Sequence, residues 1–213
     1  MQLGLPFDIF GIVVLILSVV LHEVAHGYAA RLLGDQTAAR AGRLTLNPLK
    51  HIDLMGSVII PAFLVLTKSG ILFGWAKPVP YNPYNLKNQR WGEAFVASAG
   101  ALTNIALAII FAFIARGADA AGFPVFTLLA GTVVLTNLFL GLFNLIPVPP
   151  LDGYTVLRGL LPYKFSVGLK SFEERMRSGG IITFILILFV FSYVLSGPFI
   201  NVVIYLAGLL LGA

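Results

Sequence analysis

The sequence contains no cysteine and very little charge. Without cysteine, the chain cannot form disulfide bonds, offer thiolate metal ligands or use a cysteine nucleophile, and its redox compartment cannot be inferred. Only 11% of the 213 residues are charged, whereas 58% are hydrophobic and the mean hydropathy is +0.93. This composition is typical of a polytopic membrane protein.

Two further absences limit the organisation of the chain. The sequence has no long hydrophilic stretch that could form an inserted soluble module, so we expect a single membrane-embedded domain over residues 1–213. The first ten residues contain neither Lys nor Arg and therefore lack the basic region of a signal peptide, so we expect no cleavage there. The net charge of +5 accompanies no nucleic-acid-binding motif, and we expect no nucleic-acid partner.

The apolar stretches predict an all-α polytopic membrane protein with about four transmembrane helices. These helices are expected over residues 7–33, 92–115, 125–146 and 181–212, the last kinked or split at Gly197-Pro198. A basic surface helix is expected around Phe165–Arg177. The prolines between Gly74 and Pro83 require extended or turn structure.

The apolar residues 54–73 are marginal for a membrane span, because Pro61, Lys68 and Gly70 interrupt them. If this stretch returns to the side it came from, thirteen of the fourteen Lys and Arg residues lie on one side of the membrane and only Arg116 on the other. If it spans, the basic residues divide between the two sides. The positive-inside rule favours a re-entrant or interfacial segment, with the N-terminus outside and both polar stretches cytoplasmic.

The first apolar stretch contains the motif His22-Glu23-Val24-Ala25-His26. On a helix, the two histidines are one turn apart and point the same way, so they can hold one zinc ion. The glutamate lies about 100° round the helix and can act on a water molecule at the metal. A lone His on an apolar helix is often a packing residue, but ionisable groups at membrane depth favour a functional site.

A catalytic zinc site needs a third protein ligand and one open position. His51, Asp53 and Glu93 are candidates in or next to polar segments. Asp152 differs because it follows an apolar helix and a proline-rich turn and precedes Gly153, which permits a tight backbone. Asp-Gly is also common in ordinary turns, so the spacing alone leaves the role of Asp152 open.

The two motifs together resemble the site-2 protease family of intramembrane zinc metalloproteases. That family carries H-E-x-x-H on one transmembrane helix and N-x-x-P-x-x-P-L-D-G on another, as in Asn144 to Gly153 here. The resemblance implies that His22, His26 and Asp152 bind one Zn²⁺ per chain and that Glu23 is the general base. Asn144 matches the family asparagine that binds the substrate backbone or the oxyanion.

The resemblance extends over nearly the whole chain. Ser98–Asn104 is similar to the A-G-P-x-x-N motif of the family, with Ala101 in place of proline, so Asn104 could serve the site or only bond between helices. Asn47 to Gly56-Ser57, followed by Gly74 to Pro80, is similar to the compact branch without PDZ or CBS modules. In the family, the region after the first motif carries strands that pair with an unwound substrate.

Two alternatives remain open in the middle of the chain. The stretch from Ile71 to Tyr81 could add an extended substrate to its edge, or it could be an interfacial loop anchored by Trp75 and Tyr81. A stripe of small residues on the second long helix is interpreted as a packing face. The stripe consists of Gly100, Asn104, Ala108 and Ala112.

The expected function is zinc-dependent cleavage of single-span membrane proteins within the lipid bilayer. We expect a bacterial or archaeal cell membrane and an active site near the cytoplasmic face. The alternative is a non-proteolytic metal-binding chaperone or transporter on the same scaffold. The presence of Glu23 argues against this alternative, because metal binding alone does not need a base. The sequence names neither a substrate nor an oligomeric state.

Overall fold

The structure is a computed structural model that describes residues 5–67, 74–178, 180, 187 and 189–212. These residues form helices and connecting loops and contain no β-strand. The α-helices are α1 (Leu5–Leu32), α2 (Thr37–Arg40), α3 (Ile60–Leu66), α4 (Gln89–Ala120), α5 (Pro124–Asn144), α6 (Asp152–Leu160), α7 (Tyr163–Ser178) and α9 (Ser196–Leu211). Short 3₁₀-helices lie at Pro48–His51 and Pro83–Asn85, and π-helical turns at Leu54–Ile59 and Phe191–Leu195.

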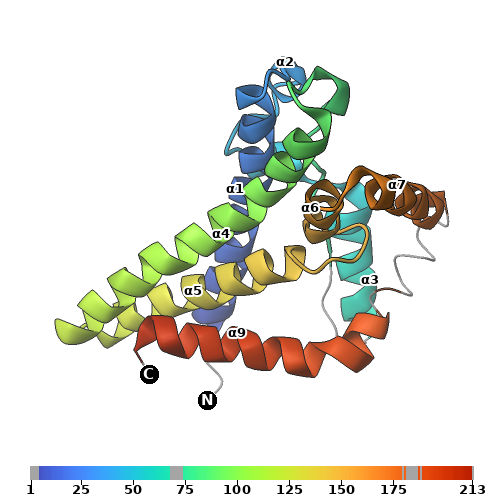
Figure 1. Cartoon of the computed structure of the whole chain (residues 1–213). Coiled ribbons are helices and arrows are strands. Elements are labelled where there is room, and N and C mark those ends of the chain that lie inside the picture. Colours follow the sequence, from blue (N-terminus) through green and yellow to red (C-terminus); the bar gives the residue numbers. More distant parts are fainter. Residues whose placement is uncertain (1–4, 68–73, 179, 181–186, 188, 213) are drawn as a thin grey trace.

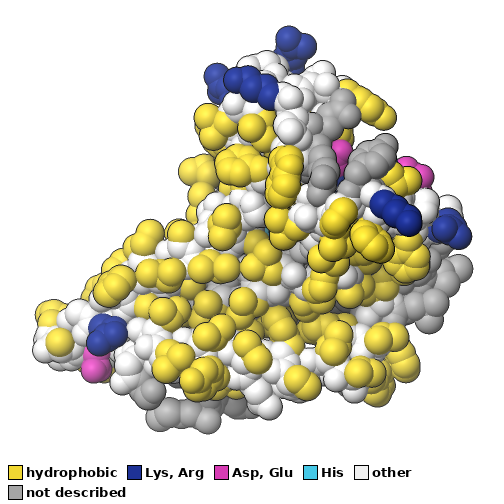
Figure 2. Space-filling model, viewed as in Figure 1, with side chains coloured by type: hydrophobic (Ala, Val, Ile, Leu, Met, Phe, Trp, Pro, Cys, Tyr) yellow, Lys and Arg dark blue, Asp and Glu magenta, His cyan; other side chains and the backbone are white. Residues whose placement is uncertain are grey.

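In the described part of the chain, four helices are long and apolar enough to cross a membrane, which confirms the predicted fold class. They cover Ile9–Leu32, Trp91–Ala120, Pro124–Asn144 and Phe191–Leu211. In Figure 1, α4 and α5 run side by side, α1 crosses them and α9 runs beneath α5 in this view. The surface over these helices is largely hydrophobic, and Lys and Arg gather near α2 and over α7 (Figure 2). The protein is therefore an integral membrane protein.

Small side chains allow α4, α5 and α9 to pack closely. Ala108 and Ala112 are buried in a cluster that also contains Val134 and Leu138 of α5 and Ala207 of α9. Bilayer lipid is as apolar as these side chains, so close contact between helices stabilises the bundle. This half of the small-residue stripe is a packing face, as predicted.

Several helix ends differ from the sequence prediction. The side chain of Asn88 accepts a hydrogen bond from the Trp91 amide and starts α4 earlier than expected. The helix then continues through Gly117, and the turn before α5 is confined to residues 121–123. The break near Gly197-Pro198 is a helix boundary, because α9 begins at Ser196 and Pro198 lies in its first turn, where a missing N–H costs little.

In the segment after α2, residues 56 and 57 lie against Trp75, so the two ends of the apolar stretch are close together. The apolar helical stretch Leu54–Leu64 is too short to be a membrane span. The Trp75 amide donates to the Gly56 carbonyl at 3.1 Å, and the Ser57 hydroxyl donates to the Trp75 carbonyl at 2.8 Å. Residue 56 must be glycine, because a Cβ there would overlap the Trp75 ring. This closed geometry agrees with the predicted re-entrant or extended segment; residues 68–73 lie outside the described part of the chain.

Asp35 fastens the end of α1 to the loop that precedes α4. Its buried carboxylate accepts hydrogen bonds from the Thr37 hydroxyl and amide, the Asn82 amide and the Asn85 side chain, at 2.6–3.2 Å. Burial alone would raise the pKa of Asp35, but these hydrogen bonds outweigh burial and hold the pKa below its ordinary value.

We predict that Asp35→Ala lowers the free energy of unfolding at pH 7 by about 1.5–3 kcal/mol, the usual contribution of hydrogen bonds to a charged group. Because the folded state lowers this pKa, the stabilisation is present above the unfolded value of about 4 and is lost as pH falls through the folded value. Unfolding midpoints in detergent, measured from pH 7 to pH 2, should therefore converge for wild type and variant. The exposed Asp119→Ala is the matched control, and a gap that persists at low pH would contradict the assignment.

Candidate metal centre

The motif on α1 and the start of α6 meet at one point. His22 Nε2 and His26 Nε2 are 3.0 Å apart, and Asp152 Oδ2 lies 3.0 Å from the first and 3.2 Å from the second. Among the described residues, this is the group of His, Asp and Glu side chains that could hold a metal ion. The structure thus brings the three predicted ligands together, although α1 and α6 are far apart in the chain.

The turn before Asp152 determines where this carboxylate lies. Helix α5 ends at Asn144, and the chain turns through its prolines to begin α6 at Asp152. Gly153 lies directly against the Leu145 carbonyl, and a Cβ at this position would overlap that oxygen. Glycine therefore lets the first turn of α6 sit on the end of α5, which places Asp152 beside α1.

Hydrogen bonds to the far ring nitrogens orient both imidazoles. His22 Nδ1 lies 2.6 Å from Asn104 Oδ1, and His26 Nδ1 lies 2.7 Å from the Val96 carbonyl. Both partners are acceptors when Asn104 presents its oxygen, so each Nδ1 carries the proton and each Nε2 turns a lone pair toward Asp152. This is the tautomer that a metal-binding histidine needs.

The three facing atoms fit a zinc ion. Asp152 Oδ2 is buried and accepts no hydrogen bond, as expected if neither Nε2 carries a proton. Ligands about 2.0–2.1 Å from a tetrahedral zinc are about 3.3–3.4 Å apart, close to the 3.0–3.2 Å observed here. Two imidazoles and one carboxylate are also ligands that zinc accepts. The donor set, its tautomers and its spacing therefore agree.

Gly100 of α4 forms a wall of the centre. A Cβ at this position would lie 2.6 Å from both His22 Nε2 and His26 Nε2. Together with Asn104 one turn further on, it brings α4 against the imidazoles. The stripe of small residues therefore has two roles, because its first half faces the site and only its second half is a packing face. Asn104 both joins two helices and orients His22.

Asn137 and Ser18, which the sequence alone did not single out, support this arrangement. Asn104 Nδ2 donates to Asn137 Oδ1 at 2.8 Å, and Asn137 Nδ2 donates to the Ser18 hydroxyl at 2.9 Å. All three side chains are buried. The bond to Asn137 fixes the Asn104 amide so that its oxygen faces His22. An Asn in the middle of an apolar helix is the signal that could have revealed Asn137.

The other predicted candidates have different roles in the structure. The His51 ring lies 2.9 Å from the Thr45 carbonyl through Nε2, and Asp53 accepts the Gly56 amide at 2.7 Å. Glu93 forms a half-buried ion pair with Arg158, which ties the start of α4 to α6. Asn144 donates to the Leu140 carbonyl of its own helix at 3.0 Å, and its predicted substrate role stays a prediction.

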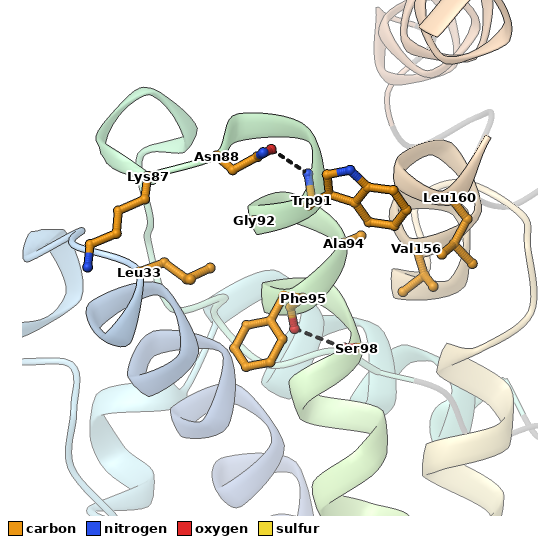
Figure 3. A pocket seen from close by; sticks show the side chains of 10 residues that line it. All are labelled: Leu33, Lys87, Asn88, Trp91, Gly92, Ala94, Phe95, Ser98, Val156 and Leu160. Carbon is orange, nitrogen blue, oxygen red and sulfur yellow. Dashed lines mark hydrogen bonds between the residues drawn. The ribbon is translucent and has the colours of Figure 1, made fainter. Parts of the chain in front are cut away.

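A pocket of about 450 Å³ lies at the end of α1 (Figure 3). It lies between the end of α1, the start of α4 and the second half of α6, with Trp91, Phe95 and Leu160 on its walls. None of the three metal ligands lines it, so it is distinct from the centre.

Comparison with known proteins identifies the chain's relatives. It is 38% identical to "Putative zinc metalloprotease YwhC" of Bacillus subtilis over 89% of the chain and 85% of that protein. The chain belongs to this zinc metalloprotease family. It is also 31% identical to "Putative zinc metalloprotease Rip2" of Mycolicibacterium smegmatis, over 71% of the chain and 59% of that protein. The match to zinc metalloprotease MJ0392 of Methanocaldococcus jannaschii is 27% identical and spans 83% of the chain and 41% of that protein.

No protein-family model and no solved structure match the chain. The relatives' names indicate a zinc-dependent protease, and the donor set described above is one that zinc accepts. The family membership and the geometry therefore agree on the cofactor.

We predict that Asn104→Leu weakens zinc binding by about 10–100-fold, because His22 loses the partner that fixes its tautomer. Zinc affinity is measured by competition with a chromophoric chelator in detergent. Thr103→Val on the same helix is the matched control, since the Thr103 hydroxyl bonds only to the Ala99 carbonyl of α4. Equal affinities in wild type and Asn104→Leu would show that Asn104 does not orient the ligand.

Proposed function

We propose that the chain is an intramembrane endopeptidase of the site-2 protease type that cleaves membrane-embedded segments of single-span proteins. The observation that carries this proposal is the position of the metal centre. His22, Glu23 and His26 lie within the apolar span Ile9–Leu32, so a peptide bond must come to membrane depth to reach them. A protease acting on soluble proteins has no need of ligands placed at this depth.

The residues of the centre divide the chemistry between them. A bound zinc would polarise water and the peptide carbonyl, which is the Lewis-acid role of this metal in hydrolases. Glu23 would accept the proton of the attacking water and pass it to the leaving amine. Asn144, one helix end away from Asp152, would donate to the substrate backbone or oxyanion once its side chain leaves the Leu140 carbonyl.

The extended residues 74–81 would hold an unwound substrate. Their amides at Trp75 and Lys77 donate inward, to the carbonyls of Gly56 and His51. In an extended chain, the hydrogen-bonding groups of successive residues point to opposite sides, so the carbonyls of residues 74, 76, 78 and 80 would face outward. Two of these are prolines without an N–H, and the outer edge is therefore rich in acceptors. This pattern supports a substrate strand that docks mainly through its own N–H groups.

We further propose that the centre lies near the cytoplasmic face of a bacterial or archaeal cell membrane. The support is the gathering of basic side chains around α2 and α7, because cytoplasmic loops carry an excess of Lys and Arg (Figure 2). With this topology, the connection between α4 and α5 would lie outside.

Cysteine labelling tests this topology, because the chain has no cysteine of its own. Single cysteines at Lys50, Lys87 and Lys170 should react with a membrane-impermeant maleimide only from the cytoplasmic side. A cysteine at Asp119 should react only from the outside. If the cysteines introduced at Lys50 and Lys87 are labelled from opposite sides, residues 54–73 span the membrane and this topology is refuted.

We predict that Glu23→Gln keeps zinc and fold but lowers the cleavage rate by about two to four orders of magnitude, the usual effect of a positioned acid–base group. Asp152→Asn should lose zinc affinity as well as activity, because a neutral amide is a poor zinc ligand. The measurement pairs zinc content with cleavage of a single-span substrate in proteoliposomes, with and without chelator.

Glu174→Gln, an exposed change of the same type on α7, is the matched control. Cleavage by Glu23→Gln at the wild-type rate would refute the mechanism. A wild-type protein that cleaves no member of a broad panel of substrates would favour the non-proteolytic alternative.

A further inference from the structure

One backbone amide of the extended segment bonds directly to the proposed general base. The Val79 N–H donates to Glu23 Oε2 at 2.8 Å. The Val79 side chain is buried and faces Gly27, one turn of α1 beyond Glu23, where a Cβ would lie 2.8 Å from Val79 Cγ1. Val79 therefore meets α1 through two separate contacts, one polar and one apolar, on the same face of the helix.

The segment is held in place on both sides of Val79 without help from Glu23. Before it, the Lys77 amide donates to the His51 carbonyl at 2.8 Å, and Arg43 Nη2 donates to the Lys77 carbonyl at 2.7 Å. After it, the Asn82 amide donates to Asp35 at 2.9 Å.

The flanking prolines add to this restraint. Pro78 and Pro80 restrict the backbone dihedrals around Val79, so the direction of its N–H is fixed before any substrate arrives. A donor fixed in this way can hold a side chain that would otherwise sample several rotamers.

We propose that the Val79 N–H is a positioning group that orients the carboxylate of Glu23 for proton transfer. This inference rests on the proposed function, because it concerns the base of that reaction. Holding Oε2 leaves Oε1 to face the water. Displacing a catalytic group by about 1 Å can cost about 100-fold in rate, so this restraint should affect turnover strongly.

The kinetic test removes the N–H and keeps an extended backbone. Val79→Pro should lower kcat by about 10–100-fold while KM stays within about twofold, since the change affects Glu23 and not the substrate contacts. Val79→Ala keeps the amide and should recover most of this loss. Zinc content and unfolding midpoint are measured for both variants.

The outcomes of this kinetic test are distinct. A wild-type kcat in Val79→Pro would overturn the inference, and equal losses in both variants would reduce Val79 to a packing residue. A faster Val79→Pro would show that the segment blocks Glu23 instead of orienting it, which also overturns the inference.

A second test needs neither activity nor a folded Val79→Pro variant. Val79 carries the one amide between two prolines, so its hydrogen exchange can be followed by mass spectrometry of a short peptide. In Glu23→Ala, this amide should exchange at least about tenfold faster than in wild type, because it loses its acceptor. The Asn82 amide, bonded to Asp35, is the internal control and should not change.

Exchange at Val79 that is unaffected by Glu23→Ala would overturn the inference even where the wild-type protein cleaves its substrate. A wild-type protein that cleaves nothing would overturn the proposed function, whereas the exchange comparison would still decide whether Val79 holds Glu23. The two failures are therefore distinguishable.

Discussion

The structure depends on satisfying polar atoms at membrane depth. A charged or hydrogen-bonding group in this environment is costly unless each of its atoms has a partner. His22 and His26 meet this condition by directing Nδ1 to fixed acceptors and Nε2 to the metal position. The acceptor of His22 is itself fixed by a chain of buried side chains that ends at α1. The metal centre and the packing of the bundle therefore require each other.

Helix α4 connects the parts of this arrangement. It approaches α1 closely at Gly100, supplies Asn104 to one imidazole, and carries the Val96 carbonyl for the other. At its start, Glu93 pairs with Arg158 and so holds α6, the helix that begins with the third ligand. The two separated motifs meet because both pack on the same helix, although α4 itself contributes no metal ligand.

The sequence alone was enough to predict features that depend on residues close together in the chain. A helical spacing identifies His22 and His26, and the proline-rich turn before Asp152 makes a third ligand plausible on chemical grounds. Charge placement indicated that residues 54–73 return, and the bond between Trp75 and Gly56 agrees with this. The start of α4 was misplaced, because a cap such as Asn88 extends a helix beyond its apolar residues.

What could not be predicted depends on contacts between distant segments. Asn137 looks like an isolated polar residue until α5 packs beside α4, and the bond between Val79 and Glu23 joins positions 56 residues apart. The exposed fractions of the three ligand side chains show which side of the centre is least covered, and the sequence cannot give this. The Asp152 side chain is 22% exposed, compared with 8% for His22 and 12% for His26. The centre is therefore least covered on the side of α6, which carries the carboxylate ligand, and more covered at both imidazoles.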